Sequence, residues 1–130
     1  MTIANWCVVA ACILPVLTVG LAKASTARLS RKNGGYDNQH PRDWAAKLGG
    51  WQARAVAAQS NGFESLPLFI AAVVLAQQAH AEQATIDALA LSFIAIRMVY
   101  IALYLLDYAV LRSLVWGLGV AACIAIMALS

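Results

Sequence analysis

Four long apolar segments dominate the sequence, at about residues 3–22, 50–79, 85–106 and 112–129. An α-helix of twenty residues measures about 30 Å, which matches the hydrocarbon core of a bilayer. Backbone polar groups inside lipid must be satisfied within their own segment, so each run is expected to be a helix. The period-two alternation of a membrane β-barrel is absent. We therefore predict an all-α, integral membrane four-helix bundle in a single domain, residues 1–130.

The composition excludes an ordinary soluble domain. Hydrophobic residues make up 62% of the chain and charged residues 12%, against about 45–50% and 25% in soluble domains. So small a body buries only about two-thirds of its surface, and disorder requires low hydrophobicity. The lipid bilayer is thus the expected surrounding partner. The tryptophans lie near segment ends and are interpreted as anchors at the membrane surface: Trp6, Trp44, Trp51 and Trp116.

Positive charge is concentrated between the first two segments. Residues 23–54 hold seven of the nine lysines and arginines, against only Asp37 and Asp43. The positive-inside rule places the loop at residues 23–49 in the cytoplasm and both termini on the other side. No nucleic-acid-binding motif accompanies this charge, so nucleic acid is not an expected partner.

Neither a disulfide framework nor a metal site is expected. The three cysteines, Cys7, Cys12 and Cys123, all lie in apolar runs. Their odd number and the absence of C-x-x-C spacing favour small buried hydrophobes. His40 and His80 have no partner at the spacing of metal ligands, and each is interpreted as a solvated loop histidine.

Polar residues inside the second and third segments share faces. Arg54, Asn61 and Glu64 fall within about 80° of one another on a helix. In the third segment, one face carries Arg97, Tyr100, Tyr104 and Asp107. Charged groups at bilayer depth are rare, costly and usually functional.

Glu64 and Arg97 are expected to lie at one depth. Each lies ten residues, or about 15 Å of helix, from one end of its segment. In both segments this is the end on the same side of the membrane as the basic loop. We therefore predict that they approach each other, within a subunit or across an interface. One interpretation is a buried pair that only fixes helix packing. The other is a polar pocket open to the cytoplasm, suited to a zwitterionic ligand with several carboxylates.

These residues resemble the signature of the MAPEG family, the membrane-associated proteins of eicosanoid and glutathione metabolism. The resemblance rests on Arg54-Ala55-x5-Asn61-x2-Glu64-x2-Pro67-Leu68-Phe69, on Arg97-x2-Tyr100-x3-Tyr104 and on Arg112-Ser113. The loop stretch Tyr36-Asp37-Asn38-x-His40-Pro41-Arg42 is similar to the small bacterial inner-membrane branch. The resemblance covers essentially the whole chain.

The resemblance implies a homotrimer that binds glutathione between neighbouring subunits. It places glutathione contacts on Arg54, Asn61, Glu64, Arg97, Tyr100 and Tyr104. It assigns activation of the thiol to Arg112, with Ser113 beside it, and a lipophilic electrophile would arrive from the bilayer. One departure is Ala57, where animal members of the family carry a second arginine.

Three functions remain open from the sequence. The leading hypothesis is an inner-membrane enzyme, a glutathione-dependent transferase or peroxidase acting on a lipophilic substrate. The second is a non-catalytic membrane protein that keeps the fold, which Ala57 favours. The third is a small proton-coupled exporter built around Glu64, because such coupling needs a carboxylate that exchanges protons.

Overall fold

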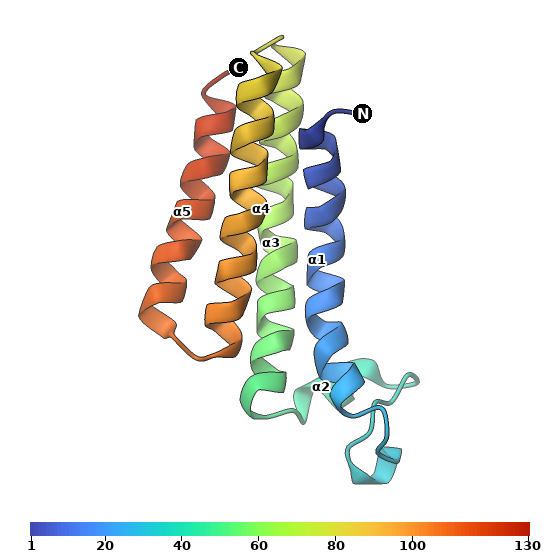
Figure 1. Ribbon diagram of the computed structural model, residues 1–130. Coiled ribbons are helices and arrows are strands. Elements are labelled where there is room, and N and C mark those ends of the chain that lie inside the picture. Colours follow the sequence, from blue (N-terminus) through green and yellow to red (C-terminus); the bar gives the residue numbers. More distant parts are fainter.

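The computed structural model describes all residues, 1–130, and every regular element in it is helical. Four long helices lie side by side (Figure 1), and a short helix and a 3-10 turn occupy the loop after the first. The elements are α1 (Ile3–Ser25), η1 (Arg31–Asn33), α2 (Pro41–Ala46), α3 (Gly50–Gln78), α4 (Gln83–Leu105) and α5 (Ala109–Met127). The long helices begin and end within three residues of the ranges expected from hydropathy.

Three of the long helices are apolar enough to cross a membrane. These are α1, α4 and α5, with mean hydropathies of 2.1, 2.0 and 2.0. Helix α3 is the longest, at 29 residues, but it does not reach the same hydropathy. Arg54, Asn61 and Glu64, together with several glutamines, lower its average. The helix least suited to lipid therefore carries three of the predicted site residues.

Small residues allow the helices to approach closely. Alanines at positions 4, 11, 72, 76 and 90 are buried in the main core. At Gly62 a Cβ atom would lie 2.6 Å from Cγ of Pro15, so α1 and α3 meet where only glycine fits. Phe69 of α3 stacks on Phe93 of α4 with ring centroids 4.0 Å apart. Small residues that let two backbones approach closely are typical of helix contacts in membranes. The stacked aromatic rings add to this packing.

The two tight turns use left-handed residues that are not glycine. His80 ends α3 with φ 58°, and Asp107 ends α4 with φ 66°. In each turn the next amide donates back across the helix end, from Ala81 to the Ala76 carbonyl and from Tyr108 to the Leu103 carbonyl. This is the Schellman arrangement, which normally places glycine at the left-handed position. The sequence therefore lacked the usual signal for either helix end.

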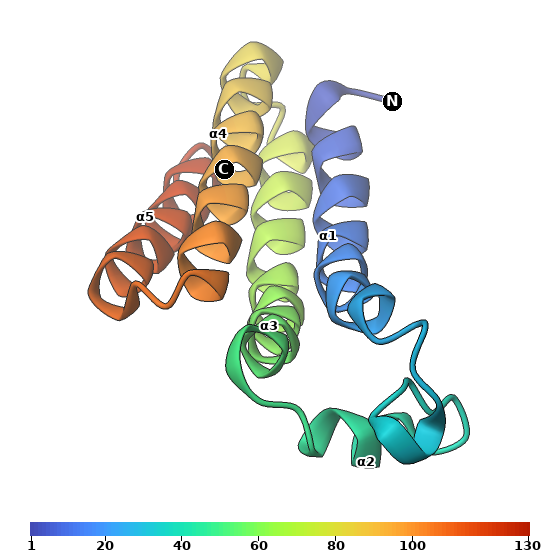
Figure 2. The same cartoon turned by 60° about the horizontal axis from the view of Figure 1, so that its bottom comes forward.

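The basic loop folds into an ordered cap at the ends of α1 and α3 (Figure 2), and this end of the molecule is here called the loop end. Its centre is Trp44, which is only 6% exposed and packs with Ala22 and Ala55. The Trp44 indole donates a hydrogen bond of 3.2 Å to the Gly34 carbonyl, and Tyr36 meets its ring edge-on. The prediction that Trp44 anchors at the membrane surface is therefore wrong, because the loop buries it in a core of its own.

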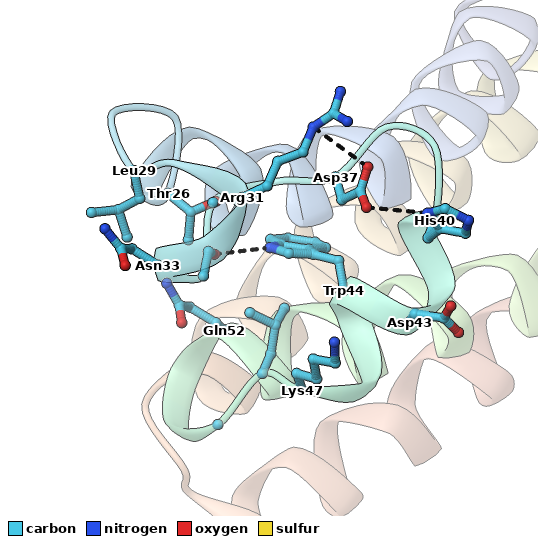
Figure 3. A pocket seen from close by; sticks show the side chains of 14 residues that line it. Thr26, Leu29, Arg31, Asn33, Asp37, His40, Asp43, Trp44, Lys47 and Gln52 are labelled. Carbon is cyan, nitrogen blue, oxygen red and sulfur yellow. Dashed lines mark hydrogen bonds and ion pairs between the residues drawn. The ribbon is translucent and has the colours of Figure 1, made fainter.

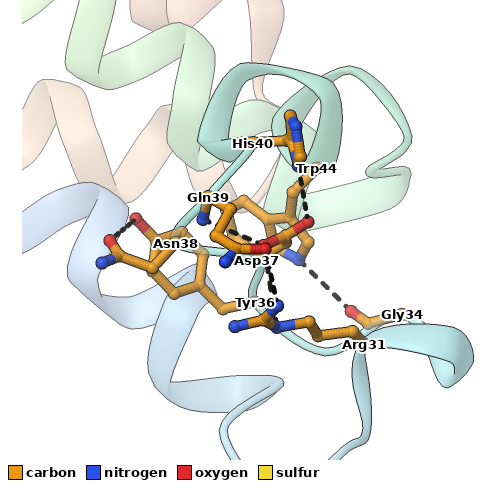
Figure 4. A network of polar contacts seen from close by, with 8 residues as sticks. All are labelled: Arg31, Gly34, Tyr36, Asp37, Asn38, Gln39, His40 and Trp44. Atoms are coloured by element: carbon orange, nitrogen blue, oxygen red, sulfur yellow. Dashed lines mark hydrogen bonds and ion pairs between the residues drawn. The ribbon is translucent and has the colours of Figure 1, made fainter.

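Asp37 organises the polar side of this cap (Figure 4). Its carboxylate accepts a hydrogen bond from the Gln39 amide at 2.9 Å and lies 3.3 Å from Nδ1 of His40 and 3.7 Å from Nε of Arg31. The Gln39 hydrogen bond is the main reason that the pKa of Asp37 lies below its usual value. A depressed pKa stabilises the fold above the unfolded-state pKa, and this contribution is lost as the pH falls through the folded-state value. His40 thus has a carboxylate partner that the sequence did not indicate.

Asp87 holds the start of α1 at the opposite end of the molecule. Its Oδ1 accepts hydrogen bonds from the Ala4 amide at 2.8 Å and from the Gln83 side chain at 2.7 Å. We expect Asp87→Ala to lower the free energy of unfolding by about 1 kcal/mol, the usual cost of losing a helix cap. Asp87→Asn keeps an acceptor and should lose less. Unfolding in a denaturing detergent, with Asp43→Ala as the exposed control, measures this; equal stability of all variants would contradict it.

Candidate functional site

Two adjoining cavities lie between α3, α4 and α5, each with a volume of about 200 Å³. The first, here called the polar chamber, is nearer the loop end and is lined by Asn61, Tyr100, Tyr104, Arg112, Ser113 and Trp116. The second, the deep chamber, has Asn61, Glu64 and Arg97 on one side and apolar walls that include Leu68, Phe93, Val120 and Cys123. Asn61 and Trp116 line both cavities, so the chambers meet at these two side chains.

Arg97 is the most unusual residue of the site. Its side chain comes from the middle of α4, and the residue is only 5% exposed. Nη1 donates a 3.0 Å hydrogen bond to Oδ1 of Asn61, and the guanidinium lies 4.3 Å from the ring centre of Tyr100. Nη2 has no hydrogen-bond partner. A buried donor with no acceptor is costly, and more so when it is charged. The geometry therefore calls for an acceptor from outside this chain.

Glu64 lines the deep chamber together with Arg97, but the two form no ion pair within the chain. Asn61, one helical turn earlier on the same face, takes the hydrogen bond from Arg97 instead. Glu64 is left exposed on the outer surface of α3. An unpaired carboxylate that faces lipid is costly. Within this chain Glu64 is therefore free to contact a ligand or a second protein chain.

The polar chamber holds a second cation without a carboxylate partner. The Arg112 guanidinium lies 4.1 Å from the ring centre of Tyr104, and no acidic side chain of the chain pairs with it. Tyr100 and Tyr104 meet edge to face, with centroids 5.6 Å apart. The Ser113 hydroxyl donates to the Ala109 carbonyl at 3.1 Å. The chamber thus presents a guanidinium and phenol rings to whatever enters.

Arg54 lies outside both chambers. Its Nε and Nη2 donate to the Leu105 carbonyl at 3.1 and 3.0 Å, and Nη1 is 3.9 Å from Asp107. The last carbonyls of a helix lack partners and carry partial negative charge, so a cation is favoured there. In this structure Arg54 caps α4, and the expectation of a ligand contact rests on the resemblance alone. Sequence spacing indicated the correct face of α3 but not this partner.

A larger cavity of about 520 Å³ lies in the loop cap (Figure 3). Its charged lining comes from Arg31, Asp37, His40, Asp43 and Lys47. The first three of these already interact with one another, and no cluster of acidic, histidine or cysteine residues there fits a metal ion. No buried side-chain nitrogen or oxygen in it lacks a partner, because the one such atom in the chain belongs to Arg97. The chambers between the helices are therefore the better candidate site.

Sequence reasoning missed Trp116 as part of the site. It was interpreted as a membrane-surface anchor, yet its indole lines both chambers. The signal was present, because Trp116 follows Arg112 and Ser113 by four and three residues and so shares their helix face. Cys123 also lines the deep chamber, as a buried thiol with no disulfide.

Comparison with protein families matches residues 3–130, essentially the whole chain, to the MAPEG family. No curated protein matches the sequence significantly, and neither does any solved structure. The match spans the helices that carry Asn61, Arg97 and Arg112, and three of the long helices are apolar enough to cross a bilayer. The chain is a multi-pass membrane protein and belongs to the MAPEG family.

Proposed function

We propose that the protein binds glutathione, or a similar thiol with several carboxylates, and transfers it to a lipophilic electrophile or uses it to reduce one. The observation that carries this proposal is the pair of guanidinium groups without carboxylate partners, Arg97 and Arg112, at two adjoining chambers. Guanidinium groups bind carboxylates through paired, charge-assisted hydrogen bonds. Family membership supports the same ligand class, since these proteins belong to glutathione and eicosanoid metabolism.

The roles of the residues follow from their positions. Arg97 and Asn61 would hold a carboxylate, and Glu64 the ammonium group, of the bound thiol. Tyr100 and Tyr104 would line its path toward the loop end. Arg112 would stand beside the sulfur, with the Ser113 hydroxyl near it.

Arg112 supplies the chemistry that a thiol needs. A free thiol has a pKa of about 8.5, so little thiolate is present at neutral pH. A fixed guanidinium beside the sulfur stabilises the thiolate and so raises the fraction of thiol in the nucleophilic form. The lipophilic substrate would enter from the bilayer, because the chambers lie among helices that lipid surrounds.

The assembly that suits this site is a homotrimer of four-helix subunits in a bacterial inner membrane. All four long helices would span the bilayer, with the basic loop in the cytoplasm and both termini outside it. Helix α3 is the least apolar, and its exposed Glu64 needs a polar covering. A second subunit on this face, with the ligand between the two, supplies that covering.

A non-catalytic protein of the same fold is the second candidate. Ala57 stands where animal members of the family carry an arginine, and Arg54 is already engaged with the Leu105 carbonyl. The two candidates differ in one measurement, the ultraviolet absorbance of thiolate when glutathione is bound. A binding protein without chemistry would show no such absorbance.

Calorimetric titration of glutathione into the purified protein tests the proposal. We expect binding, and we expect Glu64→Gln to weaken it about tenfold or more, since a hydrogen bond to a charged group contributes about 1.5–3 kcal/mol. Glu82→Gln is the matched control, because Glu82 lies in the turn between α3 and α4 and its side chain bonds only the Thr85 hydroxyl. No binding by the wild-type protein, or equal effects of the two substitutions, would contradict the proposed site.

A further inference from the structure

The turn between α4 and α5 is not held in place by apolar packing. Every residue from Leu106 to Leu111 is exposed. The buried residues of α5 begin only at Gly119, in the second half of the helix. In Figure 1, α5 diverges from α3 toward the loop end. The start of α5, which carries Arg112, therefore needs a contact other than core packing to fix its place.

Arg54 of α3 contacts this turn directly. Its Nε and Nη2 both donate to the Leu105 carbonyl, and its Nη1 lies 3.9 Å from the Asp107 carboxylate. The Arg54 side chain is 29% exposed and the Asp107 side chain 68%, so the bonds to the Leu105 carbonyl contribute more than the solvent-screened ion pair. One guanidinium therefore joins α3 both to the end of α4 and to the turn after it.

The same turn determines where Arg112 lies. Leu105 adjoins Tyr104, and the ring centre of Tyr104 lies 4.1 Å from the Arg112 guanidinium. The Arg112 amide donates to the Tyr108 carbonyl at 2.9 Å, so the first turn of α5 is built directly on the α4–α5 turn. A shift of this turn would therefore move Arg112 relative to the polar chamber.

We propose that Arg54 is a positioning residue, which holds Arg112 at the polar chamber through the turn between α4 and α5. This inference rests on the proposed thiol chemistry, in which Arg112 stands beside the sulfur. Arg54 lines neither chamber, so its effect on the reaction passes through Arg112. Misplacement of a group by about 1 Å can cost about a hundredfold in rate, so a small displacement of the guanidinium is enough to slow turnover.

The first experiment compares two variants that each lose a contact at a helix end. The probe electrophile is chlorodinitrobenzene, on which the glutathione sulfur replaces chloride. Arg54→Met should lower turnover about tenfold or more, with glutathione affinity nearly unchanged. Arg54→Lys keeps the charge but not the planar fork and should retain part of the turnover. Asp87→Ala loses the bond to the Ala4 amide at the opposite end of the molecule and should match the wild-type protein. Equal turnover of Arg54→Met and Asp87→Ala would overturn the inference.

Two further readouts separate positioning from a loss of stability. The ultraviolet absorbance of bound glutathione, followed against pH, gives the pKa of the bound thiol. A displaced guanidinium stabilises the thiolate less, so this pKa should rise in Arg54→Met toward the free value of about 8.5, and not in Asp87→Ala. Combined with Arg112→Ala, Arg54→Met should lower turnover no further, because the two residues act as one unit. An unchanged pKa, or fully additive effects, would show that Arg54 does not act through Arg112.

Amide hydrogen exchange tests the contact without glutathione. In the ligand-free protein, Arg54→Met should speed exchange over residues 106–112 by about tenfold or more, as loss of a charge-assisted hydrogen bond predicts. Asp87→Ala should leave this segment unchanged. That difference supports the positioning contact even if glutathione does not bind, in which case only the thiol chemistry fails. Equal exchange of the segment in the two variants contradicts the contact even if glutathione binds normally.

Discussion

Arg112→Ala is expected to reduce the turnover of glutathione conjugation by about 10²–10³-fold, with a much smaller effect on glutathione affinity. This is the usual cost of removing one fixed donor from a site where negative charge develops. Arg112 lies over the Tyr104 ring and has no carboxylate partner, so its charge is available to a thiolate. The measurement combines steady-state kinetics with the ultraviolet absorbance of bound thiolate.

The controls separate charge from shape. Arg112→Lys keeps the positive charge but not the planar fork, and should retain part of the activity. Arg28→Ala removes an equal charge from the exposed loop and should have no effect. If Arg112→Ala is as active as the wild-type protein, thiol activation does not depend on this residue, and the proposed chemistry is wrong in its central step.

Arg97→Met should weaken ligand binding without lowering the stability of the ligand-free protein. Glutathione affinity should fall by about 2 kcal/mol or more, at least thirtyfold, because a buried charge partner of the ligand is lost. The ligand-free protein should be no less stable, since an apolar side chain replaces a buried guanidinium whose Nη2 has no partner. Titration calorimetry and detergent unfolding measure the two effects on the same samples.

Arg54→Met is the matched control for this experiment. Arg54 caps α4 through the Leu105 carbonyl and lines neither chamber. Its replacement should lower stability by about 1 kcal/mol or more, because the capping bonds are charge-assisted, and should leave glutathione affinity nearly unchanged. If Arg54→Met instead abolishes binding while Arg97→Met does not, the site lies closer to the loop end than the chambers indicate.

Much of the fold was predictable because a bilayer restricts the secondary structure of each segment that crosses it. Every backbone group inside a bilayer must be bonded within its own segment, so apolar length alone gave the positions of α1, α3, α4 and α5 to within three residues. The loop was harder to predict, since α2 is short and depends on the burial of Trp44. The left-handed caps at His80 and Asp107 carry no glycine and gave no signal.

The helical class, the family and the faces of α3 and α4 that carry polar groups were predictable from the amino acids, because these depend on composition, motif and periodicity along one helix. Which polar groups meet one another became known from the packing of the helices alone. Arg97 bonds Asn61 rather than Glu64, Arg54 caps α4, and Trp116 joins two chambers. Such pairings depend on how far each helix is rotated and shifted against its neighbour, and packing between helices sets that relation rather than the residues of either helix alone.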